Sequence, residues 1–372
     1  MARRRSPGRY IRFLQLITAG ALTPLAIVVF HLVIPFGGVT ASAAALATAT
    51  LVLLPIRARI RFGFEDTRRV PGVSSLVLLF DLVWMATVLS PITTVLAAAI
   101  LAIAGRASLA AACTHGVASA ALFAAYGVLV RRRWVARRKL EVKIANLPPS
   151  LDGYRIVQLS DLHIGSIDRG AAALAWSRAA NALSPDLIVV TGDMLTTGTA
   201  YHDDAVAALS ALRARDGVYA CLGNHDYYSE GDLCRALDER GVRVLRNEGV
   251  VIGDLFVAGV EDAWRGTPDL TAALRDRGER PVVLLAHNPD FFPKAKQAGV
   301  ELTLSGHTHA GQLAVPFFVS RATLSHFVTR WPVGLYRDGN AQIFVHAGLG
   351  TTGPAIRIGA APEVVEIVLR RG

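Results

Sequence analysis

Five short polar motifs occur in the C-terminal part of the chain, each directly after an apolar run. They are Asp161-Leu162-His163, Gly192-Asp193, Asn224-His225-Asp226, His287, and His307-Thr308-His309. Residues two apart on extended backbone face the same way, so such a pair of side chains can bind one ion. Oxygen and nitrogen donors without a thiolate suit Mn, Fe, Zn or Mg. Singly, each motif fits a turn cap or a buried histidine; all five in order predict a metal centre.

Strands are the elements that would position these motifs. Strands are expected at 155–159, 187–191, 218–222, 255–260, 282–286, 302–305, 343–346 and 364–369. Helices are expected at 171–183, 203–213, 231–240, 269–277 and 291–298. This alternation predicts an α/β domain that becomes more β-rich after Gly311. The motifs would then lie at the carboxyl ends of strands, where open α/β sheets bind their ligands.

The order of the motifs resembles that of the calcineurin-like metallophosphoesterase superfamily. Its blocks D-x-H, G-D, G-N-H-D, H and G-H-T-H fall between Asp161 and His309, and the resemblance extends to about Gly372. The residues around three motifs are similar to the YkuE-type branch, some of whose members carry membrane segments. These stretches begin Leu159-Ser160-Asp161, Ala286-His287-Asn288 and Gly306-His307-Thr308. The resemblance implies a four-layer α/β/β/α sandwich.

The resemblance also implies a ligand set and a reaction. The first of two divalent metal ions would be held by Asp161, His163, Asp193 and His309. The second would be held by Asp193, Asn224, His287 and His307. Two such ions hold phosphoryl oxygens and activate a water for in-line displacement. The expected protein is therefore a metal-dependent phosphoric ester hydrolase, cleaving phosphodiester or pyrophosphate bonds of a phosphorylated small molecule, nucleotide or lipid.

His225 lies beside a ligand but outside the implied ligand set, and it is the candidate general acid for the leaving oxygen. Many relatives place an acidic residue three positions after the bridging aspartate, where this chain has Thr196. A threonine cannot stabilise an imidazolium by charge. Asp226 is an alternative orienting residue, and it is equally suited to capping the following turn. The sequence leaves both roles of Asp226 open.

Two further residues are candidate substrate contacts. Arg357 ends a glycine-rich run, 348–357, whose backbone amides together with the guanidinium would hold a second phosphate. His346 ends the strand before this run and would line the cleft. A surface arginine and a buried histidine are the alternative interpretations.

The N-terminal part is much more apolar than a soluble domain. In the 372-residue chain, 52% of residues are hydrophobic and 18% are charged, and the mean hydropathy is +0.40. Four apolar segments, at 11–36, 40–56, 73–105 and 107–130, approach or exceed the roughly 20 residues that a span needs. We therefore expect a transmembrane region over 1–139, a linker over 140–152 and a catalytic domain over 153–372.

The basic residues lie mainly in the N-terminal part, which argues against nucleic-acid binding. Residues 1–143 hold 18 Lys and Arg against 4 Asp and Glu, whereas the remaining residues hold 21 against 25. The clusters are Arg3/Arg4/Arg5/Arg9/Arg12, Arg57/Arg59/Arg61/Arg68/Arg69 and Arg131/Arg132/Arg133/Arg137/Arg138/Lys139. Four spans from a cytoplasmic N-terminus put every cluster inside, as the positive-inside rule requires. This topology predicts a multi-pass protein of the cell membrane with a cytoplasmic catalytic domain; a split of the third segment at Pro91 would reverse it.

Two other functional classes have some support. A metal-binding module without turnover would regulate or scaffold the membrane part. A transport or sensor protein would use the ionisable residues within the spans, His31, Asp81 and His115, although interhelical hydrogen bonding is the commoner role of such residues. The odd number of cysteines, three without C-x-x-C spacing, indicates neither a disulfide framework nor a thiolate zinc site and suits a reducing compartment.

Overall fold

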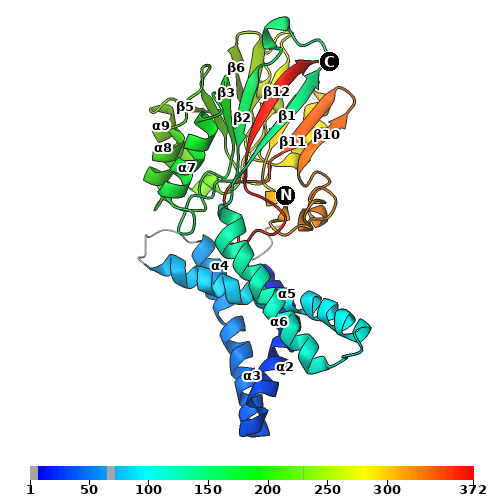
Figure 1. The fold of residues 1–372 in the computed structure, drawn as a ribbon. Helices are drawn as coiled ribbons and strands as arrows, with labels where there is room; N and C mark the ends of the chain where they lie inside the picture. The colour runs from blue at the N-terminus through cyan, green and yellow to red at the C-terminus, as the bar shows by residue number, and fades with distance from the viewer. Residues whose placement is uncertain (1–6, 65–71, 229) are drawn as a thin grey trace. The chain divides into compact units, whose positions relative to one another are not determined.

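The structure is a computed structural model that describes residues 7–64, 72–228 and 230–372. These residues form two compact units (Figure 1). The helical unit comprises the described residues up to Arg131 together with Gly353–Ile356. The catalytic unit comprises Arg132–Thr352 and Arg357–Gly372. Each unit is described on its own below.

The helical unit consists of six helices, counted within the described ranges. They are α1 (Pro7–Ala21), α2 (Thr23–Val33), α3 (Gly38–Leu53), α4 (Pro55–Phe64), α5 (Val73–Ile103) and α6 (Leu109–Ala125). Three continuous helical stretches, Gly38–Ile60, Val73–Ile103 and Leu109–Arg133, are long and apolar enough to cross a membrane. The first predicted span is instead a pair of helices bent by 46° around Leu22, so the number of spans rises to four only if this pair crosses as one.

The third apolar segment is one helix, α5, which continues through Pro91. Proline lacks the N–H that would bond to the carbonyl four residues earlier. Ser90 compensates for the loss, because its hydroxyl donates to that carbonyl, on Thr87, over 2.9 Å. Replacement of a lost backbone bond by a serine hydroxyl is a known way for apolar helices to tolerate proline. The split of this segment at Pro91, considered above, does not occur.

The ionisable residues of the helical unit differ in their surroundings. Asp81 is fully buried and accepts two hydrogen bonds from Arg59, at 2.7 and 2.8 Å. His31 and His115 are exposed on the helix surfaces. A bidentate arginine–carboxylate pair compensates both charges within the unit. The three residues expected to mark a polar pathway therefore do not form one cluster.

The catalytic unit contains two six-stranded mixed sheets in its described residues. The first has the order β1 (Ala136–Ile144), β12 (Glu363–Arg371), β2 (Arg155–Leu159), β3 (Leu187–Thr191), β4 (Val218–Cys221) and β5 (Val242–Val244). The second has the order β10 (Gly334–Asp338), β11 (Ala341–Val345), β9 (Leu302–Ser305), β8 (Val282–Leu285), β7 (Leu255–Gly259) and β6 (Glu248–Ile252). Within them, β2–β3–β4–β5 and β7–β8–β9–β11 run parallel.

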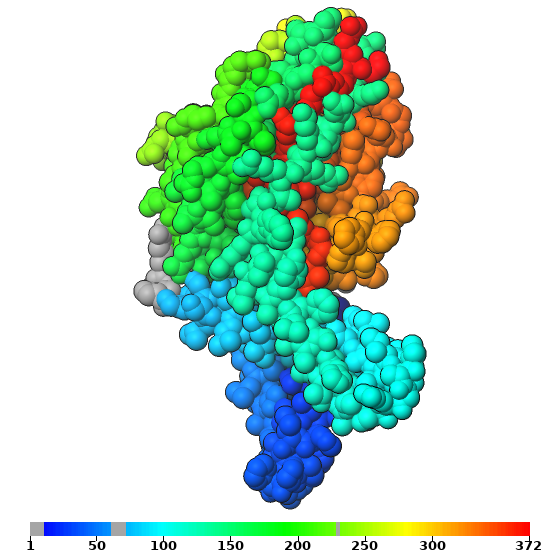
Figure 2. Space-filling view, in the orientation of Figure 1, coloured from blue at the N-terminus to red at the C-terminus, as the bar shows by residue number. Residues whose placement is uncertain are grey.

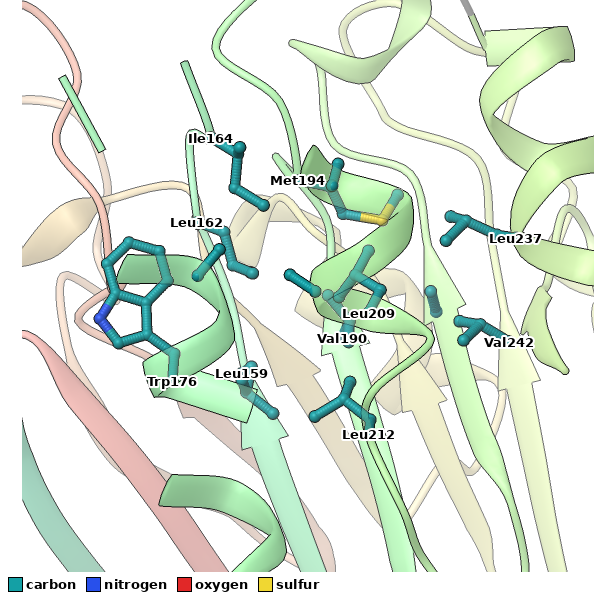
Figure 3. Close-up of a cluster of buried hydrophobic side chains, with 14 of the residues drawn as sticks. Leu159, Leu162, Ile164, Trp176, Val190, Met194, Leu209, Leu212, Leu237 and Val242 are labelled. Atoms are coloured by element: carbon teal, nitrogen blue, oxygen red, sulfur yellow. The ribbon is translucent and has the colours of Figure 1, made fainter. Parts of the chain in front are cut away.

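Three apolar layers hold the sheets and helices together. Ile156, Val189, Leu285 and Leu304 belong to the core between the sheets. Helices α7 (Gly170–Asn181), α8 (His202–Leu209) and α9 (Glu230–Asp238) cover the outer face of the first sheet, and Figure 3 shows the side chains between them. The second sheet packs through Phe256 and Leu284 against the segments of α10 (Leu270–Ala273) and α11 (Phe292–Gln297). The layers are those of the expected α/β/β/α sandwich.

The first part of the segment expected to be a linker, residues 140–144, belongs to the first sheet. β1 pairs in parallel with β12 at Ala136–Ile144, and the two strands lie side by side at the surface (Figures 1 and 2). The sequence did not predict β1 as a strand, because its basic residues lie at an exposed edge of the sheet and show no apolar pattern. Arg138 and Lys139 lie 3.9 and 3.7 Å from Glu363 and Glu366. Two members of the third basic cluster thus pair within the catalytic unit.

Candidate metal centre

The five polar motifs meet at one edge of the sandwich. Asp161 and His163 follow β2, Asp193 follows β3, and Asn224 follows β4 in the first sheet. His287 follows β8, and His307 and His309 follow β9, in the second sheet. All five strands belong to the parallel parts of the sheets, so their carboxyl ends point to the same edge. The structure therefore brings together the predicted motifs from both sheets.

One group of donor atoms combines Asp161, His163 and His309, whose ligand atoms lie within 4.8 Å of one another. The Nε2 atoms of the two histidines are 3.0 Å apart. The Nε2 of His309 also lies 3.3 Å from the Oδ1 of Asp161. Imidazole and carboxylate donors converging at such distances match the ligand chemistry of a divalent transition metal.

A second group combines Asp193, His287 and His307. The Nε2 of His287 lies 3.3 Å from the Oδ2 of Asp193 and 3.2 Å from the Nδ1 of His307. The same Oδ2 lies 3.4 Å from the Nε2 of His163 in the first group. Asp193 consequently stands between the two groups, in the place that a bridging carboxylate requires.

An unpaired polar atom of the site fits a cation. The buried Oδ1 of Asn224 has no hydrogen-bond partner among the described residues. The Nδ1 of His287 lies 2.7 Å from the carbonyl oxygen of Thr191, to which it donates. This bond leaves the Nε2 of His287 facing the donor group, as for metal-binding histidines whose other nitrogen is held by a carbonyl.

The motifs adopt backbone conformations that side-chain-bearing residues rarely use. The φ angles are 50° at Asp161, 43° at His163, 51° at Asp193, 70° at His307 and 51° at His309. Residues with positive φ other than glycine cost free energy and cluster at functional sites. Neighbouring glycines permit the close approach of these loops. A Cβ on Gly223 would collide with Asp193, and one on Gly306 would collide with Ser160 and Asp161.

Burial controls the protonation of the donor groups. It lowers the pKa of His163 and of His307 to about 3, so both imidazoles are neutral at physiological pH and have a lone pair to donate. Burial also raises the pKa of Asp161 to about 7, against the attraction of His287 and with the repulsion of Asp193. A bound cation would favour the ionised form of this carboxyl group.

His225 lies next to this centre and is held by the backbone. Its Nδ1 is 2.6 Å from the carbonyl oxygen of Thr196, and its ring packs edge-on against that of His163 with centroids 4.8 Å apart. The hydroxyl of Thr196 donates to the carbonyl of His163 over 2.7 Å. The backbone carbonyl at position 196 therefore contacts the imidazole.

Asp226 joins the loops that carry the motifs. Its carboxylate accepts backbone N–H groups of Met194 and Leu195 at 2.9 and 3.1 Å, and of Gly223 at 2.9 Å. Burial and the charge of Asp193 raise the pKa of Asp226 to about 7, although these N–H donors oppose the shift. These bonds tie the loops after β3 and β4 together, which differs from the capping of the following turn considered above.

The two expected substrate contacts lie beneath the surface. Arg357 is fully buried; its guanidinium donates to the carbonyls of Gly350 and Ala347 and lies 3.5 Å from the Nδ1 of His309. His346 is also fully buried, and its Nδ1 accepts the N–H of Gly348 over 2.8 Å. Arg357 is therefore not a surface arginine, and His346 matches the alternative of a buried histidine. Contact of either residue with a substrate stays a prediction.

One loop beside the centre escaped sequence analysis. Asp262 and Trp264 follow β7, which adjoins β8 in the second sheet. The rings of Trp264 and His307 are perpendicular, with centroids 4.3 Å apart. The sequence offered one signal for this loop, which is that it follows a predicted strand, as the five motifs do. The loop was missed because Asp262 and Trp264 have no histidine beside them and no spacing typical of metal ligands.

Comparisons with known proteins agree with this geometry. Residues 154–311 match the family model described as calcineurin-like phosphoesterase. The uncharacterized metallophosphoesterase YkuE of Bacillus subtilis is 31% identical over 62% of this chain and 83% of its own length. An uncharacterized metallophosphoesterase of Aquifex aeolicus is 32% identical over 62% of this chain and 90% of its own length.

One longer relative is described by its name as a transmembrane protein. The transmembrane protein with metallophosphoesterase domain of Bos taurus is 33% identical over 62% of this chain. The match spans only 56% of that relative's length. The family resemblance expected from the five motifs is confirmed by these matches.

Proposed function

The chain belongs to the calcineurin-like phosphoesterases, and on that basis we propose that it is a membrane-anchored enzyme that hydrolyses phosphodiester or pyrophosphate bonds of nucleotide or lipid-linked substrates. The family depends on two metal ions, and the enzyme is a metal-dependent phosphoric ester hydrolase. The kind of phosphate bond that is cleaved and the class of substrate are our proposals. The observation that carries the proposal is the convergence of the two donor groups on Asp193.

The proposed ligands follow the two groups of donor atoms. Asp161, His163 and His309 would hold one ion, and His287 and His307 the other, with Asp193 shared. Asn224, whose buried Oδ1 has no hydrogen-bond partner among the described residues, would join the second ion. When bound, two divalent ions supply charge to the phosphoryl oxygens and lower the pKa of a water molecule. The neutral imidazoles of His163 and His307 are ready to donate without first losing a proton.

The chain itself supplies proton transfer and exact positioning. His225 donates a proton from Nε2 to the leaving oxygen, while the Thr196 carbonyl holds Nδ1–H and fixes the orientation of the ring. Asp226 keeps the loops after β3 and β4 together through its bonds to Gly223 and Met194. Arg357 supports His309 from below and thus acts as a positioning residue.

Membrane anchoring rests on the three long apolar helices and on the name of the bovine relative. In the proposed topology the protein is multi-pass and its catalytic unit faces the cytoplasm, because the basic residues flanking the apolar segments then lie inside. Of those residues, Arg3, Arg4, Arg5, Arg68 and Arg69 lie outside the described ranges.

The experiment is a turnover assay with the full chain in detergent, loaded with Mn²⁺. Phosphomonoesters, phosphodiesters, nucleotide sugars and phospholipids would be compared at equal concentration. We expect diesters or pyrophosphates to be preferred, and activity to disappear on chelation and return with metal. Exclusive hydrolysis of monoesters would contradict the proposed bond specificity. Metal binding without any turnover would favour the alternative of a regulatory module.

A further inference from the structure

Trp264 is an exposed aromatic residue beside the metal centre. The residue is 60% exposed, although its ring lies perpendicular to that of His307, a proposed ligand of the second ion, with centroids 4.3 Å apart. Trp84 and Trp176, by contrast, are almost fully buried in the cores of their units. Trp134 is comparably exposed, at 66%, and lies before β1, in a segment that carries none of the five motifs. Trp264 therefore combines an open aromatic surface with proximity to the place where a phosphate would bind.

The loop that carries Trp264 is held firmly in place. The carboxylate of Asp262 accepts the backbone N–H groups of Trp264 and Arg265 at 2.8 and 3.0 Å. The N–H of Gly266 donates to the carbonyl of Asp262 over 2.9 Å, which closes the turn. These three bonds restrict the backbone on both sides of the indole, so its position is fixed before any ligand binds.

The base of the loop is tied to the rest of the unit. The N–H of Asp262 donates to the Tyr227 hydroxyl over 3.0 Å, and Glu261 pairs with Arg246 at 2.7 Å. A Cβ on Gly266 would collide with Tyr227, so glycine allows the turn to pack this closely. A loop built this tightly around an indole left in solvent indicates a binding role, since the indole adds little to the core.

The surroundings of Trp264 indicate a planar ligand group. Of its neighbours in the loop, Ala263, Arg265 and Thr267 are exposed and only the alanine is apolar. The exposed apolar residues Val315, Phe317, Phe318, Phe327 and Val328 belong to a separate segment after β9. An acyl chain needs a continuous apolar surface along its length. A nucleobase needs only one aromatic face, and base–aromatic stacking tolerates polar surroundings.

We propose that Trp264 is a specificity-determining residue, which stacks on the nucleobase of a nucleotide substrate whose phosphate lies at the metal centre. The inference rests on the proposed phosphoesterase function and selects nucleotides from its two substrate classes. The indole would contribute to substrate affinity, and His225 would retain the proton-transfer step.

Binding of AMP and of inorganic phosphate to the Mn²⁺-loaded full chain tests the stacking without turnover. Titration calorimetry would compare the wild type with Trp264→Ala, Trp264→Phe and the matched control Trp134→Ala. In Trp264→Ala the preference for AMP over phosphate should fall about 5- to 100-fold, and Trp264→Phe should restore much of it. Trp134→Ala should keep the wild-type preference. An unchanged preference in Trp264→Ala, or a wild type that binds AMP no more tightly than phosphate, would overturn the proposal.

Turnover measurements distinguish base stacking by Trp264 from the proposed phosphodiester hydrolysis. Thymidine 5′-(4-nitrophenyl phosphate) and ethyl 4-nitrophenyl phosphate share a leaving group and differ in the base. Trp264→Ala should raise KM for the thymidine ester more than for the ethyl ester, with similar kcat. An equal loss on both esters would mean that Trp264 acts through His307 and would overturn stacking. If neither ester is cleaved but the AMP preference falls, diester hydrolysis fails while the base-binding role stands.

Discussion

The Nδ1 atom of His225 lies 2.6 Å from the carbonyl oxygen of Thr196. The family resemblance implied an acidic side chain at this position, whereas here the backbone of Thr196 contacts the histidine. A carbonyl oxygen orients the ring by accepting a hydrogen bond from Nδ1–H, but it carries no full negative charge that would stabilise an imidazolium. The orientation of His225 consequently does not depend on the type of side chain at position 196.

Replacing His225 with alanine should remove proton donation to the leaving oxygen. His225→Ala should keep both metals and lose about 10²- to 10⁴-fold in kcat on esters with poor leaving groups. The loss should be smaller for 4-nitrophenyl esters, because nitrophenolate leaves without a proton. Thr196→Ala is the matched control, since it keeps the carbonyl that holds Nδ1. Equal losses on both kinds of ester, or a similar loss in Thr196→Ala, would contradict this assignment.

Replacing Asp193 with asparagine should weaken both metal sites. The Oδ2 of Asp193 lies within 3.4 Å of the Nε2 atoms of His163 and His287, one from each donor group. Its neutral isostere would remove charge shared by two ions, so we expect at least about 100-fold less activity and lower metal content. Elemental analysis and turnover check this on the same preparation. Two metals per chain with nearly normal turnover would rule out a bridging role.

His346 should make the stability of the catalytic unit depend on pH. Burial, with a contribution from the charge of Arg357, lowers its pKa to about 3, whereas an unfolded histidine titrates near 6.5. Between these values only the unfolded chain binds the proton, so stability is fully present above pH 6.5 and is lost as the pH falls. The slope from this residue approaches about 1.4 kcal/mol per pH unit.

The variant His346→Asn isolates this effect. Its amide oxygen can accept the Gly348 N–H that the Nδ1 of His346 now accepts, and it does not titrate. Thermal unfolding of both proteins between pH 7 and 4 should give a shallower decline of the midpoint temperature for the variant. Parallel curves would show that His346 is not held neutral in the folded chain.

The proposed topology can be tested at Ser150, which is exposed in the catalytic unit. In a background without Cys113, Cys221 and Cys234, Ser150→Cys should resist membrane-impermeant thiol reagents in intact cells. The same residue should react once the cells are permeabilised, which serves as the accessibility control. Labelling from outside would place the catalytic unit on the other side of the membrane.

The motif-bearing strands were predictable because the information is local. Residues 155–159, 187–191 and 302–305 are short runs rich in apolar and β-branched residues and are followed closely by polar motifs, and the structure has strands at these positions. Burial on both faces explains the apolar run Leu187–Val190. The convergence of the motifs followed from the carboxyl ends of parallel strands sharing one edge.

The strands β1 and β5 were not predicted from the sequence. β1 is rich in basic residues, and only Glu363 and Glu366 of β12, far along the chain, show why its charges suit an edge strand. β5 has three residues, too few for a periodic pattern. Burial of Arg357 is likewise a tertiary property, since the carbonyls that accept its bonds belong to a loop whose path the sequence does not specify.

The position of β12 has a consequence for biosynthesis. β1 and β2 are close in sequence, yet β12 lies between them in the sheet and pairs with both. While the ribosome is still translating the segments before residue 363, β1 and β2 each expose an unpaired edge, which invites pairing with other chains. Completion of the first sheet therefore has to wait until residue 371 has left the ribosome. The helices of the N-terminal unit, which are made earlier, are available for membrane insertion before the catalytic sheet can close.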